Sequence, residues 1–508
     1  MLSLNTGDTG FVMLCTALVC MMTPALALFY GGMVRKKNVL TIMMQNFISM
    51  GVTAIIWIFG GFSLAFGPDV GGLFGDISYH FALDKVGIAP SPVYASTVPF
   101  ILFFAYQLMF AVIAPALITG AFAGRLNFRG YLKFLILWMI FIYIPVCHWI
   151  WGGGWLAQLG FHDYAGSCAI HMVGGLCALI GAKMVGPRIG KFSKDKSGKI
   201  VGVNAFPGHN IPLGCLGVFI LWLGWYGFNG AAAKSIESLG SIFLTTTVAP
   251  SVATVVCMIF TWVHYGKPDV SMCLNASLAG LVGITAGCDV LDCTGAIIVG
   301  VVSGLIVNFG VWFLDNKLHV DDPVGAVAVH FLNGIWGTLA VGLLATGTTP
   351  DYPEGMLTGL FYGGGFDLLG LQLLGVLSVC AWTAVTITVA FLLIKAIFGL
   401  RVSREEEIAG LDIMEHGLAS GYADFMPATS LLTSVEAVPT VAVETPKVSV
   451  DDAVPVVVRS DKAPASDVKM TKVSILCKQS SFEVLKTAME EIGVTGMTVS
   501  QVLGCGMQ

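Results

Sequence analysis

Eleven apolar stretches, each long enough to cross a lipid bilayer, set the main constraint on what this chain can fold into. A hydrocarbon core about 30 Å thick requires about 20 mostly apolar residues in a helix. Hydrophobic residues make up 56% of the 508 residues and charged residues only 11%, so water is not the main solvent of such a fold. We expect an all-α polytopic membrane protein. Its eleven transmembrane helices are predicted near residues 8–32, 42–66, 97–121, 134–152, 165–185, 209–231, 241–264, 272–290, 294–315, 325–346 and 367–399.

The loops between these stretches alternate in charge. One set holds nearly all of the cations, whereas the other holds only Lys85 and Lys234. The positive-inside rule makes the basic loops cytoplasmic, which predicts a multi-pass protein of the cell membrane with its N-terminus outside and its C-terminus in the cytoplasm. An odd number of spans agrees with this orientation. The basic set comprises Arg35, Lys36, Lys37, Arg125, Arg129, Lys133, Lys183, Arg188, Lys191, Lys194, Lys196, Lys199, Lys267 and Lys317.

Composition and motifs argue against several function classes. A net charge of −5 and a pI near 6.0 lack the basic excess that a nucleic-acid partner requires. The sequence shows no nucleophile and base pair, phosphate-binding loop or metal-ligand spacing, so we expect neither an enzyme nor a bound cofactor or metal. The 13 cysteines include no C-x-x-C pair and lie mostly in apolar runs, where they read as small buried hydrophobes.

One pattern, D-x-x-G-x-x-x-x-H-x-x-x-G, occurs twice, in the fifth and the tenth predicted span. Because five spans separate equivalent positions, the second copy enters the membrane from the opposite side. The pattern therefore predicts a five-plus-five inverted repeat, an architecture typical of transporters. The two copies are Asp163, Gly166, His171 and Gly175, and Asp322, Gly325, His330 and Gly334.

Each histidine of the repeat follows its aspartate by eight residues, about 12 Å of helix rise, which places it near the bilayer midplane. An ionisable side chain at that depth must face the interior of the bundle and is a candidate functional residue. A lone histidine there would more often be a hydrogen-bonded core residue. Two histidines related by an inverted repeat favour a functional pair, since a pair of imidazoles can pass a proton between them.

The aspartates and the aromatic residues leave alternatives open. Asp163 and Asp322 precede helices, so each is expected to cap free amides, with a direct charge role for Asp163 as the second possibility. Aromatic residues near the external span ends fit an interfacial belt. Trp151 is different because three glycines follow it and leave one indole face open, and such a face can hold a small cation by about 2 kcal/mol.

The chain changes character after the last apolar stretch. Residues 1–400 form the predicted membrane domain, 401–425 a polar cytoplasmic tail, and 426–470 a flexible linker rich in Val, Pro, Ala and Thr. Residues 471–508 then predict a short α/β fragment of the ferredoxin-like type, with a strand at 472–478, a helix at 480–492 and a strand at 494–502. Such a fragment cannot bury a core alone.

Taken together, the motifs of residues 5 to 425 resemble the ammonium transporter family (Amt/Mep/Rh). The resemblance implies a homotrimer with one pore per subunit and ammonium or ammonia as the substrate. The runs that carry it are F-Y-G-G-M-V-R-K-K-N (29–38), Y-I-P-V-C-H-W-I-W-G-G-G (143–154), D-Y-A-G-S-C-A-I-H-M-V-G-G (163–175), G-W-Y-G-F-N-G (224–230), V-D-D-P-V-G-A-V-A-V-H (320–330) and G-L-R-V-S (399–403).

The same resemblance assigns roles at the external mouth. Trp151 matches the family's cation-binding tryptophan, and Tyr106 takes the place of its usual phenylalanine partner. Phe110 and Phe228 match the stacked phenylalanines that gate the pore. The chain departs from the family at Ala232, where a serine usually hydrogen-bonds the recruited ammonium. A lost neutral acceptor is expected to weaken binding by about 1 kcal/mol without abolishing transport.

Inside the pore, Asp163 matches the family's aspartate near the recruitment site, and His171 and His330 match its twin histidines. The implied mechanism is that ammonium loses a proton before the apolar gate and ammonia then passes the histidines. Likeness to Amt members also implies that the proton crosses, so that net transport is electrogenic. The sequence alone leaves neutral and electrogenic transport open.

Residues 471–508 resemble the start of a PII nitrogen-regulatory protein through E-E-I-G-V-T-G-M-T-V-S and G-C-G-M-Q. By likeness, Gly506 and Gln508 are nucleotide-site positions, but the basic ATP-contacting residues are lacking, so we expect no nucleotide binding by this fragment. The resemblance implies PII control of the pore, by a domain in cis or by a separate protein in trans. Two alternatives remain: an ammonium sensor that signals through this segment with little flux, and a haem protein with His171 and His330 as axial ligands.

Overall fold

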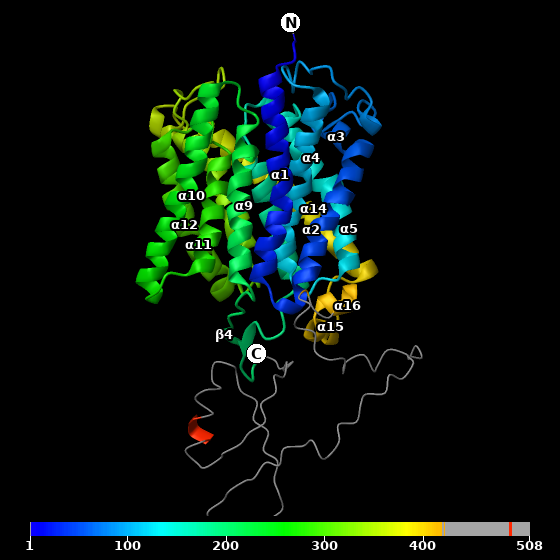
Figure 1. Ribbon diagram of the computed structural model, residues 1–508, viewed down its shortest axis with the longest axis vertical. Helices are drawn as coiled ribbons and strands as arrows, with labels where there is room; N and C mark the ends of the chain where they lie inside the picture. Colours follow the sequence, from blue (N-terminus) through cyan, green and yellow to red (C-terminus); the bar gives the residue numbers. More distant parts are fainter. Residues whose placement is uncertain (1, 419–420, 422–486, 490–508) are drawn as a thin grey trace, which may run out of the picture. The chain divides into compact units, whose positions relative to one another are not determined.

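The computed structural model of the chain describes residues 2–418, 421 and 487–489. Within Met1–Phe425 it is a bundle of helices with two small hairpins (Figure 1). The strands are β1 Asp69–Val70 and β2 Phe74–Gly75, which pair antiparallel, and β3 Phe192–Lys194 and β4 Ile200–Val203, which do the same. The α-helices are α1 Thr6–Met33, α2 Val39–Ile56, α3 Phe62–Phe66, α4 Phe100–Thr119, α5 Phe128–Trp138, α6 Ile144–Trp151, α7 Trp155–Gln158, α8 Val173–Val185, α9 Ile211–Gly230, α10 Ile236–Tyr265, α11 Val270–Thr285, α12 Cys293–Phe313, α13 Asn333–Leu344, α14 Asp367–Phe398, α15 Arg404–Ala409 and α16 Leu411–His416.

Ten helical spans of the described residues are long and apolar enough to cross a membrane, and they coincide with ten of the predicted stretches. Several combine consecutive helical segments, as in the span that joins α5 to α7. The prediction of a polytopic helical membrane protein is therefore confirmed. The ten spans are Thr6–Met33, Lys36–Phe66, Phe100–Phe122, Phe128–Gln158, Ser167–Val185, Ile211–Gly230, Ile236–Tyr265, Cys293–Leu318, Val327–Leu344 and Asp367–Phe398.

The remaining predicted stretch, 272–290, forms the shorter apolar helix α11. Its 16 residues give about 24 Å of rise, less than the core thickness of about 30 Å that the longer spans exceed or approach. α11 packs against α10 and α12 in the same bundle (Figure 1). The structure thus contains ten long spans and one short apolar helix, where the sequence predicted eleven spans.

Polar caps mark where many of these helices begin. The side chain of Asn5 accepts the amides of Gly7 and Asp8 at the start of α1, and Asp269 accepts the amide of Met272 at the start of α11. Such caps satisfy backbone donors that the first helical turn leaves free. The helix boundaries therefore follow from local residue chemistry as well as from the apolar pattern.

Both histidine spans open with a π-helical segment, in which backbone hydrogen bonds reach five residues back. One segment is Ser167–Met172, before α8, and the other is Val327–Leu332, before α13. Short π-helical segments inside α-helices are frequent at functional sites because they re-aim side chains. The repeat thus places His171 and His330 in equivalent local structure.

The two histidine spans cross at reciprocal glycines. A Cβ added at Gly175 would lie 2.1 Å from the amide nitrogen of Phe331, and one added at Gly334 would lie 2.7 Å from that of Met172. Each glycine lies four residues after its own histidine and faces the residue that follows the other one. This exchange of equivalent contacts is what a twofold axis between the repeats produces.

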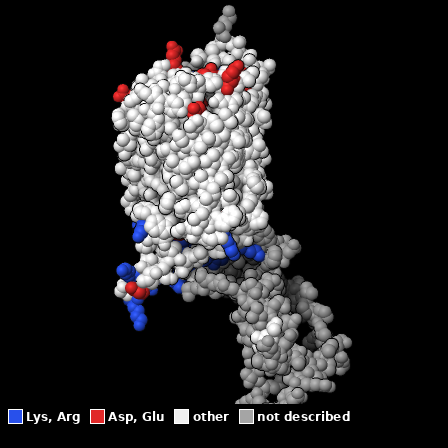
Figure 2. All heavy atoms as spheres, turned by 90° about the vertical axis from the view of Figure 1, so that its left-hand side faces the viewer, with Lys and Arg blue, Asp and Glu red and all other residues white. Residues whose placement is uncertain are grey.

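Charge divides the bundle into two ends. Figure 2 shows Lys and Arg gathered near one end and Asp and Glu mostly near the other, with neither in the band between. In Figure 1 the N-terminus lies at the end opposite to α15 and α16. The segregation of charge agrees with the loop pattern in the sequence.

The predicted linker, 426–470, lies outside the described residues, and so do Gly506 and Gln508. Residues 487–489 are described and are helical, within the helix predicted at 480–492. The tail predicted at 401–425 is described to residue 418 and at 421. It forms α15 and α16, and Glu407, Leu411 and Asp412 within it are buried.

Candidate functional site

Four aromatic side chains from three helices form a cluster inside the bundle. The rings of Phe110 and Phe228 lie 4.4 Å apart between centroids, with an interplanar angle of 39°. Tyr106 lies 4.8 Å from Phe110, and Trp151 lies 6.2 Å from it, both edge to face. The structure therefore brings together the four aromatic residues that the sequence comparison selected from α4, α6 and α9.

The cluster continues inward to the histidines. The ring of His171 lies 5.8 Å from Phe228, 5.2 Å from Trp225 and 5.3 Å from His330. The two imidazoles are nearly parallel, at 13°. Both are almost fully enclosed, with 1% of His171 and 3% of His330 exposed. Trp151, Phe110, Phe228 and the two histidines thus form an unbroken line of rings toward the centre of the bundle.

Three of the four imidazole nitrogens lack a hydrogen-bond partner among the described residues. Both nitrogens of His171 and Nδ1 of His330 are buried and unpaired. Buried polar atoms are nearly always hydrogen-bonded in folded proteins, so a water molecule or a ligand can supply the partners of these nitrogens. A small molecule with both N–H donors and a lone pair would suit these atoms.

Asp163 serves as a cap for the first histidine segment. Its Oδ1 accepts the amide of Gly166 at 2.9 Å, and its Oδ2 accepts the amides of Cys168 and Ala169 at 2.9 Å each. Its backbone carbonyl accepts Nε1 of Trp151 at 2.7 Å. Burial raises the pKa of Asp163, and the three amides oppose that effect. The capping interpretation is confirmed, and the same residue orients Trp151.

Asp322 occupies the equivalent place in the second repeat. Its Oδ2 accepts the amide of Val327 at 2.7 Å, at the start of the second π-helical segment. Burial raises the pKa of Asp322 to about 6. The favoured interpretation of this aspartate as a cap is also confirmed.

Ala232 lies just after α9 and lines a cavity of about 130 Å³. His162 and Asp289 line the same cavity and form an ion pair at 3.0 Å. Burial by itself would lower the pKa of His162, but the charge and hydrogen bond of Asp289 outweigh it and raise that pKa. Sequence reasoning missed this pair, whose members lie 127 positions apart.

A second missed pair holds the turn that carries Trp151. Nδ1 of His148 lies 2.9 Å from the carbonyl oxygen of Ala65, and Nε2 lies 2.9 Å from Oδ1 of Asp69. The hydrogen bond from His148 lowers the pKa of Asp69, which keeps this carboxylate ionised. The pair fastens the hairpin of β1 and β2 to α6.

At the basic end of the bundle, a buried ion-pair network joins the two repeats. The side chain of Arg188 donates two hydrogen bonds of 2.7 and 2.8 Å to Asp321, its backbone amide donates a third, and Arg125 donates to the carbonyl of Asp321. Burial opposes ionisation of Asp321, but the charges of Arg125 and Arg188 outweigh it and hold its pKa below the usual range. These contacts fix the segment that leads to His330.

The tail helices pack onto the same end. Asp412 accepts the amides of Leu40 and Thr41 at the start of α2, at 3.0 and 2.8 Å. Glu407 accepts the amide of Ile189 and pairs with Arg401 at 2.7 Å. The sequence indicated only a polar tail here. The structure shows that its acidic side chains bind backbone amides of the membrane domain, and that Glu407 also pairs with Arg401 of the tail itself.

Comparison with known proteins agrees with this geometry. Residues 10–421 match the family model described as Ammonium Transporter Family, and residues 470–508 match that of Nitrogen regulatory protein P-II. An ammonium transporter of Mycobacterium bovis is 39% identical over 448 residues, which are 83% of this chain and 91% of that protein.

Two solved structures are also similar. A structure described as Sensor Amt Protein shares 31% identity with a TM-score of 0.72, covering 80% of this chain and 98% of its own. The crystal structure of Candida albicans Mep2 shares 31% identity with a TM-score of 0.71, covering 79% and 88%. On the family match, the relatives and the assembled aromatic and histidine site, this chain belongs to the ammonium transporter family and is an ammonium transporter.

Proposed function

We propose that the chain recruits ammonium at Trp151 and Tyr106, removes a proton at the Phe110 and Phe228 gate, and conducts ammonia past His171 and His330. The observation that carries this proposal is the unbroken line of rings, in which neighbouring centroids lie between 4.4 and 6.2 Å apart from Trp151 to His330. Each step below rests on one part of that line.

Recruitment uses an indole face and a fixed oxygen. The hydroxyl of Tyr106 donates its one proton to the carbonyl of Phe228 at 2.8 Å, with the carbonyl of Gly227 at 3.1 Å, and its oxygen can still accept from an ammonium N–H. Trp151 supplies an aromatic face whose attraction for a cation is about 2 kcal/mol when partly desolvated. Tyr106 thus offers the neutral acceptor that Ala232 does not.

Deprotonation follows from the character of the gate. Phe110 and Phe228 are 3% and 1% exposed, and their contact leaves no polar group to replace the hydration of a cation. An unpaired charge in such a place costs several kcal/mol, whereas neutral ammonia crosses at far lower cost. Ammonium therefore gives a proton to a water molecule at the mouth before its nitrogen passes the two rings, and that proton is relayed to His171.

The histidines receive the neutral molecule and the proton. Their three unpaired nitrogens offer lone pairs to ammonia N–H groups and an N–H to its lone pair. The near-parallel rings at 5.3 Å allow a proton to pass between them with a small side-chain motion or one bridging molecule. Proton passage along this pair would make net transport electrogenic.

The membrane topology completes the proposal. The N-terminus and the helices α15 and α16 lie at opposite ends of the bundle, so the number of crossings is odd. Ten long spans then require α11 as the eleventh, with its short length met by local thinning of the bilayer. The basic end is cytoplasmic by the positive-inside rule, in the cell membrane.

Assembly and control are inferred from the resemblance. The family resemblance supports a homotrimer with one pore in each subunit. The match of residues 470–508 to the P-II model supports control by a PII-like domain, attached to this chain or acting as a separate protein. The acidic tail side chains that bind α2 and the loop after α8 offer a physical route for that control.

The experiment is an ammonium pulse applied to proteoliposomes that contain the full chain, with current and internal pH recorded together. The proposal predicts a saturating current, and Trp151→Leu should raise the half-saturating ammonium concentration about tenfold, from the loss of 1 to 2 kcal/mol of cation attraction. Binding of ammonium without current or uptake would instead indicate a sensor with little flux. Empty liposomes are the control for passive ammonia entry.

A further inference from the structure

Three sulfur atoms meet where the π-helical segment Ser167–Met172 packs against α14. Sγ of Cys380 lies 3.7 Å from Sδ of Met172, and the thiols of Cys168 and Cys380 lie close enough to interact electrostatically. Cys168 and Met172 belong to the same segment, four positions apart, and both are fully buried. The cluster therefore combines two thiols and one thioether from two spans that are far apart in the chain.

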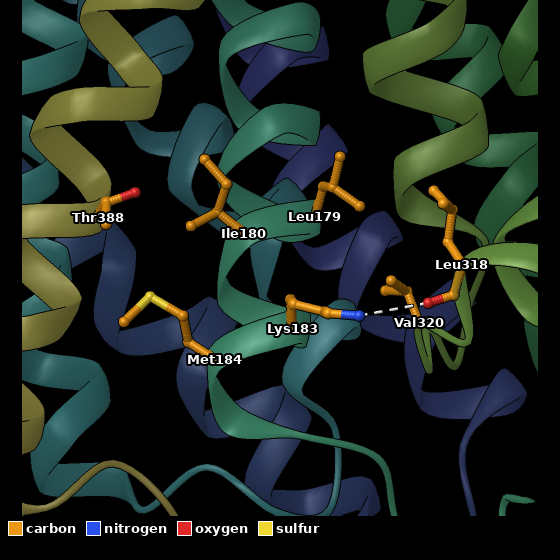
Figure 3. Close-up of a pocket in the computed structure, with 7 residues that line it drawn as sticks. All are labelled: Leu179, Ile180, Lys183, Met184, Leu318, Val320 and Thr388. Carbon is orange, nitrogen blue, oxygen red and sulfur yellow. Dashed lines mark hydrogen bonds between the residues drawn. The ribbon is translucent and has the colours of Figure 1, made fainter. Parts of the chain in front are cut away.

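The packing of two helices holds these sulfurs together. α8, which continues the π-helical segment, packs along α14. Eight residues beyond Met172 and Cys380, Ile180 of α8 and Thr388 of α14 line the same groove on the flank of the bundle (Figure 3). The equal spacing along both helices means that they run side by side in the same direction. The contact between Met172 and Cys380 is thus part of a continuous helix interface.

The cluster is open on one side. Cys168 and Cys380 both carry free thiols. Cys380 is partly exposed and lies near the middle of α14, whereas the other two sulfur side chains are enclosed. A ligand can therefore reach the sulfurs from the flank of the bundle, without passing the aromatic gate.

The donor set selects a soft metal ion. Thiols and thioethers are the ligands that Cu(I) prefers, whereas Zn²⁺ in proteins is held by Cys, His, Asp and Glu. Two sulfurs that each bind a metal at about 2.3 Å lie about 4 Å apart, so the 3.7 Å between Cys380 and Met172 needs little adjustment. The described residues contain no group of three His, Cys, Asp or Glu side chains that could hold a metal, which makes the thioether the necessary third ligand here.

We propose that Cys168, Met172 and Cys380 bind one soft monovalent metal ion of the Cu(I) class. The ion takes the place of the proton on the Cys380 thiol, which leaves as H⁺, while the Cys168 thiol and the Met172 thioether donate lone pairs. One positive charge enters as one leaves, so the occupied site stays neutral, as an apolar interior favours. The sequence showed no metal-ligand spacing because Met172 and Cys380 lie 208 positions apart.

Native mass spectrometry of the full chain, with Ag⁺ as a redox-inert probe for Cu(I), tests the proposal. Other thiols of the chain also react with Ag⁺, so the variants are compared at the same ratio of Ag⁺ to protein. Met172→Leu keeps the side-chain volume and removes the thioether, and it should lower the affinity for Ag⁺ at least about tenfold. Cys380→Ser should lose this site. Cys177→Ser is the matched control, because that thiol lies on α8 and contacts Trp138.

The melting temperature gives a second readout. A bound ion ties α14 to the residue that follows His171, so Ag⁺ should raise the melting temperature of the unmodified chain and of Cys177→Ser but not that of Cys380→Ser. Melting without Ag⁺ shows which variants fold like the unmodified chain.

Three results would overturn the proposal. Unchanged Ag⁺ affinity in Met172→Leu would show that the thioether is not a ligand. An equal loss in Cys177→Ser would show a general reaction of thiols. Equally tight binding of Zn²⁺ would show a site without preference for soft ions. Both readouts report binding, so a failure of the transport mechanism would leave these outcomes unchanged.

Discussion

The hydroxyl of Tyr30 lies between the carbonyl of Leu117, at 2.8 Å, and Nε2 of His330, at 3.3 Å. A tyrosine has one proton to donate, and the shorter bond to Leu117 takes it. Its oxygen therefore accepts from Nε2, which must carry a hydrogen. This relationship fixes the tautomer of His330 and leaves Nδ1, the unpaired nitrogen, as an acceptor in the proposed pore.

Replacing Tyr30 by phenylalanine should lower the transport rate about tenfold, because a buried donor without a partner costs about 1 to 3 kcal/mol and the tautomer is no longer held. The ammonium-evoked current in proteoliposomes measures the rate. Tyr226→Phe is the control, since this hydroxyl is exposed and bonds Thr247 away from the histidines. An unchanged current in Tyr30→Phe would refute the assignment of the tautomer.

Tyr106→Phe should raise the half-saturating ammonium concentration about fivefold, because it removes a neutral acceptor worth about 1 kcal/mol. The maximal current should change little, since the gate rings stay in place. The substitution Ala232→Ser adds a neutral acceptor instead of removing one, so it should partly restore the affinity for ammonium in the Tyr106→Phe background. If Tyr106→Phe binds ammonium as tightly as the unmodified chain, the hydroxyl has no part in recruitment.

Asp163→Ala should destabilise the protein by about 2 to 4 kcal/mol, because three buried amides lose a charge-assisted hydrogen bond. Thermal melting in detergent measures the change. Asp8→Ala, on the exposed first turn of α1, is the matched control. Wild-type stability in Asp163→Ala, combined with lost recruitment, would favour direct contact of the carboxylate with the cation.

The His162 and Asp289 pair predicts a pH-dependent stability. The pKa of His162 is raised in the folded protein above its ordinary value of about 6.5. The stabilising effect is therefore complete below about pH 6.5 and disappears as the pH rises through the raised value. The melting temperature of Asp289→Asn should fall furthest below that of the unmodified chain in acid. A difference that grows with pH would contradict this account, and Asp84→Asn, on an exposed loop, serves as the control.

The membrane spans and the central site could be predicted from the sequence because both depend on patterns among residues that are near one another in the chain. Apolar length located ten spans, and the repeated aspartate and histidine spacing located His171 and His330. The crossing of the repeats at Gly175 and Gly334 follows from the same spacing, since small residues let two backbones approach.

What the sequence missed depends on contacts between distant positions. His148 and Asp69 are 79 positions apart, and Arg188 and Asp321 are 133 apart, so no local pattern reveals either pair. The tail read as polar because Glu407 and Asp412 are acidic, yet both bind backbone amides of the bundle. The two π-helical segments likewise have no distinctive amino-acid composition from which they could be predicted. For Ala232, likeness placed the residue at the recruitment site, and this placement stays a prediction; the structure shows that Ala232 lines the same cavity as His162 and Asp289.

The most direct test of the central claim is the ammonium-evoked current of the double variant His171→Ala, His330→Ala, recorded together with ammonia uptake in the same proteoliposomes. The account predicts a saturating current in the unmodified chain, and in the variant a lost current with continued ammonia uptake, because the proton has no path. An undiminished current in the variant would show that the charge crosses without the histidine pair and would contradict the account.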